Sequence, residues 1–208
     1  MKVVTIPAGI YAANCYIVYS EDTRKGIVID PGGDVDDIIK KIEELNLDIE
    51  YIVLTHGHGD HIGGISDLKS FIDVPVAIHK EDEYMLKDGS VNLSSQMAMG
   101  NIELNADILL EDKAEISFGD LNAKVIHTPG HTPGGISLKI GDNIFTGDTL
   151  FAGSIGRTDF PGGSYEEIIS SIKNKIIIYP EETVIYPGHG PATNIKLEKA
   201  NPAVRRRW

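Results

Sequence analysis

The sequence predicts a single α/β domain with mixed β-sheets. Strand-like and helix-like segments alternate at both ends of the chain, while the middle holds several strands at the spacing of hairpins. No segment with the composition of a linker and no repeat interrupts the 208 residues, a length that suits one domain. We therefore expect one domain over residues 1–208, containing both parallel and antiparallel strand pairs.

The N-terminal part of the chain alternates between strand and helix patterns. Residues 14–19 and 26–29 are expected to form strands around a polar turn. Asp34 is expected to cap the helix that follows. Apolar residues recur in that helix with a spacing near 3.6, at Val35, Ile38, Ile39, Ile42 and Leu45. The apolar segment YIVL (51–54) predicts a strand buried on both faces, followed by a helix over GISDLKSF and a strand over VPVAIH.

The middle of the chain is less regular than its ends. Residues 80–106 carry Tyr84 and three of the four methionines, which could line a pocket as an adaptable apolar wall or pack into the core. Further strands are expected near 108–110, 115–118, 121–127, 135–140 and 143–146. Ser164 begins a capping box with Glu167 ahead of a helix, and TVIY (183–186) is expected to form the last strand.

Charge and composition limit the possible partners. The net charge of −12 argues against nucleic acid, which is bound through basic patches, and the one basic run, Arg205–Arg207, is expected to be a solvated tail. No apolar run is long enough to cross a membrane and the N-terminus makes a poor signal peptide, so we expect a cytoplasmic protein with no membrane partner. Cys15 is the sole cysteine and is expected to be a small buried side chain. The pattern leaves the oligomeric state open.

Four of the predicted strands end in glycine-rich turns that carry potential metal ligands. The segment LTHGHGDHIGG follows the strand YIVL, and three later strands lead into one histidine, one aspartate and one histidine. The seven residues are His56, His58, Asp60, His61, His131, Asp148 and His189. Because ligands at the ends of neighbouring strands converge in one crevice of an α/β protein, we expect these residues to meet.

The donor set predicts two metal ions. Imidazole and carboxylate donors without thiolate suit zinc, iron or manganese, and seven donors exceed the needs of one tetrahedral zinc. His56 and His58 point the same way in an extended turn and could share one ion, while Asp60 and His61 enter the next helix and could reach a second. Taken alone, His131, Asp148 and His189 could each be structural turn residues.

Other polar residues leave more than one interpretation. Asp30, at the strand end in IDPGG, could accept the free ring N–H of a ligand histidine or could cap a turn. Asn14, Thr55 and Thr132 could assist in the same way, although a structural role is favoured for each of them. His79 and His127 lie outside the motif, are expected to end strands or cap turns, and are not counted as ligands.

The combined motif resembles that of the metallo-β-lactamase fold superfamily. Within it, GDTLFAGSIGRTDFPGGS and PGHGP resemble the glyoxalase II-like (hydroxyacylglutathione hydrolase) branch. The resemblance implies a four-layered αββα sandwich and two divalent ions, with zinc expected and iron or manganese as alternatives. It implies three roles for the seven residues: His56, His58 and His131 on the first ion, Asp60, His61 and His189 on the second, and Asp148 bridging both. Asp60 would also act in catalysis by orienting the attacking hydroxide.

The resemblance implies hydrolysis of a thioester such as S-lactoylglutathione, with a small acyl-thiol as the partner. Arg157 and Asp159 are expected to pair and to hold their loop on the substrate side. The chain ends 19 residues after His189, so we do not expect the C-terminal helical region with which glyoxalase II recognises glutathione. The alternatives are a persulfide dioxygenase with one iron, which shares the GRTDF stretch, and a lactonase or phosphodiesterase. A secreted β-lactamase is disfavoured by the bridging aspartate and the missing signal peptide, and a flavodiiron reductase by His58, where glutamate is usual.

Overall fold

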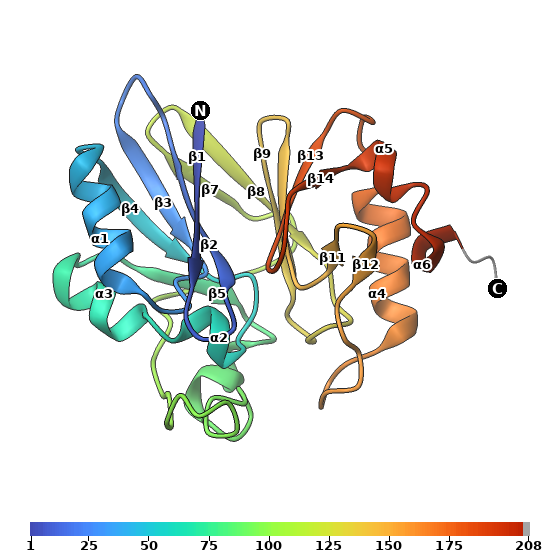
Figure 1. Ribbon diagram of the computed structural model, residues 1–208, viewed down its shortest axis with the longest axis horizontal. Coiled ribbons are helices and arrows are strands. Elements are labelled where there is room, and N and C mark those ends of the chain that lie inside the picture. Colours follow the sequence, from blue (N-terminus) through green and yellow to red (C-terminus); the bar gives the residue numbers. More distant parts are fainter. Residues whose placement is uncertain (206–208) are drawn as a thin grey trace.

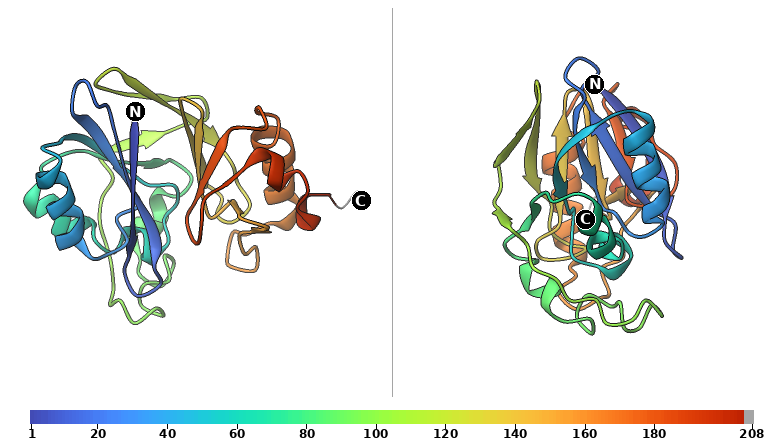
Figure 2. Two further views of the ribbon diagram at one scale, coloured as in Figure 1. Left: turned by 45° about the horizontal axis from the view of Figure 1, so that its top comes forward. Right: turned by 90° about the vertical axis from the view of Figure 1, so that its left-hand side faces the viewer.

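Two six-stranded β-sheets pack face to face and carry helices on their outer surfaces (Figure 1). This computed structural model describes residues 1–205. Helices α1 and α3 cover one side, and α4, α5 and α6 cover the other, an order of layers that is also visible in the left view of Figure 2. The expected αββα sandwich of mixed sheets is confirmed.

The first sheet is built from the N-terminal half of the chain. Its strands follow the order of the sequence: β1 (Lys2–Ala8), β2 (Ala13–Tyr19), β3 (Lys25–Ile29), β4 (Asp48–Val53), β5 (Val76–His79) and β6 (Ile108–Leu110). The first three strands pair antiparallel, and the pairs β3–β4, β4–β5 and β5–β6 are parallel. Parallel neighbours need crossover connections, which here run through α1 (Val35–Glu44) and through α2 (Gly59–Ile62) with α3 (Ile65–Phe71).

The second sheet is built from the C-terminal half. Its order is β14-β13-β10-β9-β8-β7. Its strands are β7 (Glu115–Phe118), β8 (Leu121–His127), β9 (Ile136–Ile140), β10 (Asn143–Gly147), β13 (Val184–Pro187) and β14 (Thr193–Asn194). The parallel pair β10–β13 is bridged by α4 (Tyr165–Ser171) and the π-helical turn η2 (Ile172–Ile176), after the small hairpin of β11 (Leu150–Phe151) and β12 (Ser154–Ile155). Helices α5 (Ile195–Glu198) and α6 (Pro202–Arg205) follow β14.

The apolar core consists of three clusters, each lying between two neighbouring layers of the sandwich. Strand β2 shows the reason, because its side chains point alternately to the two faces of the sheet. Cys15 and Ile17 belong to the cluster beneath α1 and α3, whereas Tyr16 and Val18 belong to the cluster between the sheets. A third cluster lies between the second sheet and α4. Cys15 is fully buried, as expected, and burial raises the pKa of its thiol.

Two local expectations change in the structure. Asp34 stands at the start of α1 but makes no capping hydrogen bond, because its Oδ2 accepts from the backbone N–H of Gly9 (2.8 Å) and ties the helix start to the β1–β2 turn. Strand β1 is not among the predicted strands. Its Pro7 is tolerated because β1 is an edge strand. The cap at Ser164 is confirmed: its Oγ accepts from the Glu167 N–H (3.3 Å).

The irregular segment 80–106 contains a short 3₁₀ helix, η1 (Glu83–Lys87), and otherwise turns (green in Figure 1). Its methionines take both of the predicted roles: Met85 is buried in the core, while Met97 lines a cavity. Across residues 1–205, no helix has the length and apolar character needed to cross a membrane. Arg205 is exposed, and Arg206 and Arg207 lie outside the described residues.

Candidate metal centre

The seven predicted ligands lie together where four strands end. His56 and His58 follow β4, and Asp60 and His61 lie in the short helix α2. His131 follows β8, Asp148 follows β10 and His189 follows β13. The first sheet therefore contributes four of these residues and the second sheet contributes three, so the cluster spans the two halves of the sandwich.

His56, His58 and His131 form what we call the first group. One ring nitrogen of each lies within 4.8 Å of the others, and His58 Nδ1 is 2.9 Å from His131 Nε2. The other nitrogens are already used: His131 Nδ1–H donates to the carbonyl of Arg157 (2.7 Å), and His56 Nδ1 is 3.1 Å from Thr55 Oγ1. These contacts fix the rings so that Nε2 of His56 and His131 faces the cluster.

Asp60, His61 and His189 form the second group. His189 Nε2 lies 3.2 Å from Asp60 Oδ2 and 3.3 Å from His61 Nε2. His61 Nδ1–H donates to Asp30 Oδ2 (3.0 Å), which again leaves Nε2 directed into the cluster. Asp30 is itself fixed because its carboxylate accepts from the backbone N–H (2.7 Å) and the hydroxyl (2.6 Å) of Thr55.

Asp148 lies between the two groups. Its Oδ1 is 3.5 Å from His61 Nε2, and its Oδ2 is 3.5 Å from His131 Nε2. Within the described part of the chain, Asp148 Oδ1 and His56 Nε2 are the buried side-chain polar atoms that lack a hydrogen-bond partner. A buried polar atom without a partner is costly, and cations at both groups would satisfy these two. The arrangement could therefore hold two metal ions.

The two groups differ in their electrostatics. Burial and the neighbouring imidazoles lower the pKa of His56 well below its ordinary value, and the same causes lower that of His58 to about 3. Burial also opposes protonation of His61, but Asp148 and Asp30 outweigh it and raise its pKa well above the ordinary value. Burial raises the pKa of Asp148, yet His61 and the other nearby imidazoles outweigh this effect and hold it far below the usual range.

Glycine allows the last ligand turn to approach the cluster. A Cβ atom at Gly188 would overlap Asp148 Oδ1 and lie 2.9 Å from His61 Cε1. Any other residue at this position would force Asp148 or the neighbouring backbone to move.

The sequence pattern assigns no role to Asp82 and favours a structural role for Asn14, yet both residues contact the ligand loops. Asp82, on the turn after β5, accepts hydrogen bonds from both ligand loops of the first group. Asn14 donates its side-chain N–H groups to the carbonyls of Pro187 and Gly190, on either side of His189. A usable signal existed for Asp82, because it follows the strand next to β4 and so lies at the same sheet edge as His56.

A further imidazole pair lies outside the cluster. His79 and His127 end β5 and β8, as expected, and their rings stack at 4.1 Å with an interplanar angle of 15°. Ring nitrogens of both lie within 4.8 Å of a carboxylate oxygen of Glu81. One nitrogen of each ring already contacts the main chain, since His127 Nε2 donates to the Pro133 carbonyl (2.8 Å) and His79 Nδ1 accepts from the Glu81 N–H (3.4 Å).

A cavity of about 330 Å³ opens onto the metal-ligand cluster. Its apolar walls come from Tyr11, Met97, Phe151 and Phe160. Its single cation, Arg157, is paired with Asp159 through two hydrogen bonds of 2.9 and 2.7 Å and stacks over Phe160 at 4.2 Å. Arg157 and Asp159 thus sit beside the site as a closed pair.

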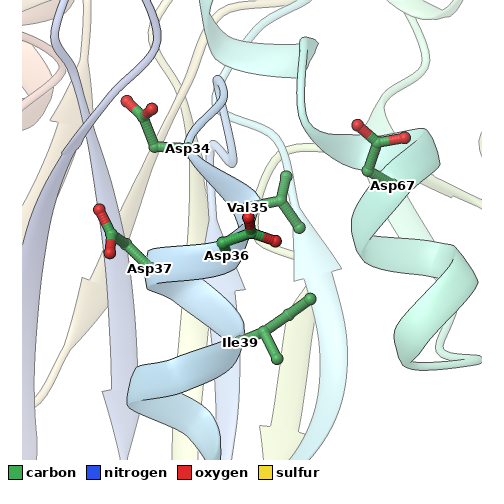
Figure 3. Close-up of a pocket in the computed structure, with 6 residues that line it drawn as sticks. All are labelled: Asp34, Val35, Asp36, Asp37, Ile39 and Asp67. Carbon is green, nitrogen blue, oxygen red and sulfur yellow. The ribbon is translucent and has the colours of Figure 1, made fainter.

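A larger cavity of about 510 Å³ lies away from the histidines. It is lined by four aspartates and two aliphatic residues of α1, α3 and the turn before α1 (Figure 3). The carboxylates come from Asp34, Asp36, Asp37 and Asp67, and none of the seven predicted ligands lines it. Size alone therefore does not identify the site in this molecule.

Curated relatives match this chain over nearly its whole length. A probable metallo-hydrolase, YqgX of Bacillus subtilis, is 38% identical over 204 residues, covering 96% of this chain and 95% of the relative. The hydroxyacylglutathione hydrolase GloC of Haemophilus influenzae is 37% identical over 207 residues, covering 97% of each.

Solved structures also match this chain over nearly its whole length. The BLEG-1 B3 metallo-beta-lactamase superposes with a TM-score of 0.94 at 36% identity, covering 99% of this chain and all of that one. TTHA1623 in a di-iron-bound form gives 0.84 at 31% identity, covering 97% and 98%, and ETHE1 from Myxococcus xanthus gives 0.81 at 29%, covering 97% and 83%. The sequence model of one family, described as the metallo-beta-lactamase superfamily, matches residues 8–189. This chain belongs to the metallo-beta-lactamase superfamily.

Proposed function

We propose that the chain is a metal-dependent thioester hydrolase that works with two divalent ions. Membership of a superfamily of metallo-hydrolases supports hydrolysis in general. The observation that carries the two-ion proposal is the position of Asp148 between the groups. Its Oδ1 lies 3.5 Å from His61 Nε2 of the second group, and its Oδ2 lies 3.5 Å from His131 Nε2 of the first group and 3.7 Å from His189 Nε2 of the second. The metals we expect are zinc ions, with iron or manganese as alternatives, and a di-iron neighbour supports keeping iron among them.

Metal ions at the two groups would supply a water of lowered pKa and polarise the acyl carbonyl. The residues of the chain would then position the reactants. Asp60 Oδ2, held 3.2 Å from His189 Nε2, lies beside the cavity and would orient the attacking water as a hydrogen-bond acceptor. A thiolate is a good leaving group, so no dedicated acid is needed. His56 and His58, whose pKa values burial lowers, would remain neutral and bind rather than transfer protons.

The cavity supports a small acyl-thiol as the substrate. Its aromatic and methionine walls suit the apolar parts of an acyl chain and its thioester. The similarity to a hydroxyacylglutathione hydrolase supports S-lactoylglutathione or a related compound. Arg157, the one cation at the cavity, is already neutralised by Asp159, so we expect recognition to depend on the acyl-thioester part more than on the carboxylates of glutathione.

Persulfide oxidation at a single iron is the second candidate. The GRTDF stretch and the similarity to ETHE1 favour it. The second group, complete and adjacent to the first, favours two ions and hence hydrolysis. A lactonase or phosphodiesterase activity belongs to the same fold and is retained as a third choice.

Metal analysis combined with a substrate panel tests the proposal. We expect about two ions per chain and turnover of S-lactoylglutathione, with slower or no turnover of a lactone, a phosphodiester and a chromogenic β-lactam. One iron per chain with oxygen uptake on glutathione persulfide would instead support the dioxygenase. Two bound ions with turnover of the β-lactam alone would contradict the thioesterase.

A further inference from the structure

Asp82 connects the two loops that carry the first group. It is fully buried, on the turn between β5 and η1. Its Oδ2 accepts from the hydroxyl of Thr132 (2.7 Å) and the backbone N–H of Gly57 (3.3 Å), and its Oδ1 accepts from the backbone N–H of Gly134 (2.6 Å). Gly57 stands between His56 and His58, while Thr132 and Gly134 follow His131.

The fit around Asp82 is close. A Cβ atom at Gly134 would lie 2.8 Å from Asp82 Cγ, so the His131 loop can reach the carboxylate only with glycine there. The backbone of Asp82 is fixed as well, since its N–H donates to the His79 carbonyl (2.9 Å) and its carbonyl accepts from Met85 (3.0 Å). The carboxylate is therefore a rigid anchor, joined to one loop from the first sheet and to one from the second.

Asn14 makes the corresponding contacts for the second group. It is 5% exposed, in β2, and its Nδ2 donates to the carbonyls of Pro187 (3.0 Å) and Gly190 (2.8 Å). Its backbone N–H donates to the carbonyl of Gly188 (2.7 Å). These contacts hold the turn on both sides of His189, and among residues 1–205 none of the hydrogen bonds of Asn14 reaches the loops of the first group.

We propose that Asp82 and Asn14 are positioning residues, each serving one metal ion: Asp82 the ion of the first group and Asn14 the ion of the second. The inference rests on the proposed two-ion function. It goes beyond that function in stating that the two ions depend on separate parts of the scaffold, so that either can be lost while the other stays. Residues that orient metal ligands typically change metal affinity by about 10- to 100-fold when they are replaced.

The chemistry of Asp82 gives a conservative variant. All three of its partners donate, so the site requires a group that only accepts. In Asp82→Asn, the amide N–H₂ must face either the N–H of Gly134 or that of Gly57, and one backbone donor loses its acceptor. Asp107→Asn is the matched control, because Asp107 also accepts from a backbone N–H, that of Val76 (2.8 Å), but contacts no ligand loop.

The test is a titration of metal-free protein with Co²⁺ against a competing chelator, followed by the visible absorption of the bound ion. His58→Ala and His189→Ala supply reference spectra for protein with only the second or only the first group intact. We expect Asp82→Asn to weaken one ion by about 10- to 100-fold and to retain a spectrum like that of His58→Ala. Asn14→Ala should weaken the other ion and resemble His189→Ala. Asp107→Asn should bind both ions as the wild type does.

Thr132→Val keeps the inference testable if Asp82→Asn does not fold. It removes one of the three donors and should weaken the same ion by a smaller factor of about 3- to 10-fold. If Asp82→Asn and Thr132→Val both bind two ions with wild-type affinities, the inference is overturned while the proposed function stands. Equal weakening of both ions by Asp82→Asn would have the same meaning. Wild-type protein that binds fewer than two ions would overturn the proposed function and this inference with it.

Discussion

The first and the second group are built from the same kind of strand-end turn, yet they offer a metal ion different surroundings. The first group consists of three imidazoles that are at most 5% exposed, and burial lowers the pKa of two of them. The second group contains the carboxylate of Asp60, and its His189 side chain is 29% exposed. Neutral buried nitrogens bind a metal ion without having to release a proton. The first group is thus arranged to retain its ion, and the second to exchange contacts with solvent and substrate.

The largest effect should come from the residue that the two groups share. Asp148→Ala removes the carboxylate that faces both groups, so we expect loss of both ions and a fall in thioester turnover of at least about 10³-fold. Metal content by elemental analysis and turnover measure this. Asp120→Ala, on the exposed turn between β7 and β8, is the control and should match the wild type. An Asp148→Ala protein without metal that keeps full turnover would contradict the assigned site.

Removing one ligand from each group separates them. His58→Ala and His189→Ala should each leave about one ion per chain and lower turnover by about 10²-fold or more. Because His189 is the more exposed ligand, we expect a chelator to strip the second group of wild-type protein before the first. Time-resolved metal release shows this as two phases, and the fast phase should be missing in His189→Ala. A fast phase that persists in His189→Ala would show that the first group, and not the second, releases its ion first.

Gly188→Ala tests how closely the groups must approach. The added Cβ overlaps Asp148 Oδ1, so the variant should destabilise the fold by about 1–3 kcal/mol and weaken the second ion. Denaturant unfolding of metal-free protein measures the first effect. Gly141→Ala is the control: it has open space and a φ of 54°, so it should show only backbone strain of about 1 kcal/mol and unchanged metal binding. Equal effects of the two variants would mean that the overlap is relieved without moving the ligands.

Arg157→Ala should have a small effect on the first group despite its position. His131 uses the carbonyl of Arg157, which the substitution keeps, and exposed ion pairs such as Arg157–Asp159 contribute only about 0–1 kcal/mol. We expect metal content to be unchanged and KM to rise a few-fold as Phe160 loses its stacked partner. Loss of the first ion in this variant would show that the side chain, and not the main chain, holds His131.

The smallest effect on the metal centre concerns His79, whose imidazole lies outside both groups. Burial and the neighbouring His127 lower its pKa to about 4, below the ordinary value of 6.5. As the pH falls, His79 therefore becomes protonated in the unfolded chain before it does so in the folded protein. Protonation thus favours unfolding, and the stability that His79 contributes should fall as the pH drops from about 6.5 to about 4. His79→Phe keeps the stacked ring without the titration. The difference in free energy of unfolding between the two metal-free proteins should shift in favour of the variant over this range; a constant difference would contradict it.

The sequence indicates what is local and misses what is distant. The seven predicted ligands could be found because each lies in the turn or short helix that follows an apolar strand, a pattern contained in a few consecutive residues. Asp82 escaped notice because two of its partners, Thr132 and Gly134, are 50 and 52 positions away. Asp34 occupies the N-cap position of α1 as predicted, but its carboxylate makes no cap hydrogen bond for the same reason, since its partner Gly9 is 25 positions away. Composition and spacing do not encode such contacts, which exist only after the sheets and turns have assembled.

The division of the chain into two sheets has a consequence for assembly. Residues 2–110 form the first sheet and residues 115–194 the second, and each of the two groups draws on both. Each ion would therefore add a cross-link between two halves that are otherwise joined by one connecting segment, a shared apolar interface and hydrogen bonds such as those of Asp82 and Asn14. Ligands that bind only the docked state stabilise docking, so metal uptake would report that the halves have come together correctly.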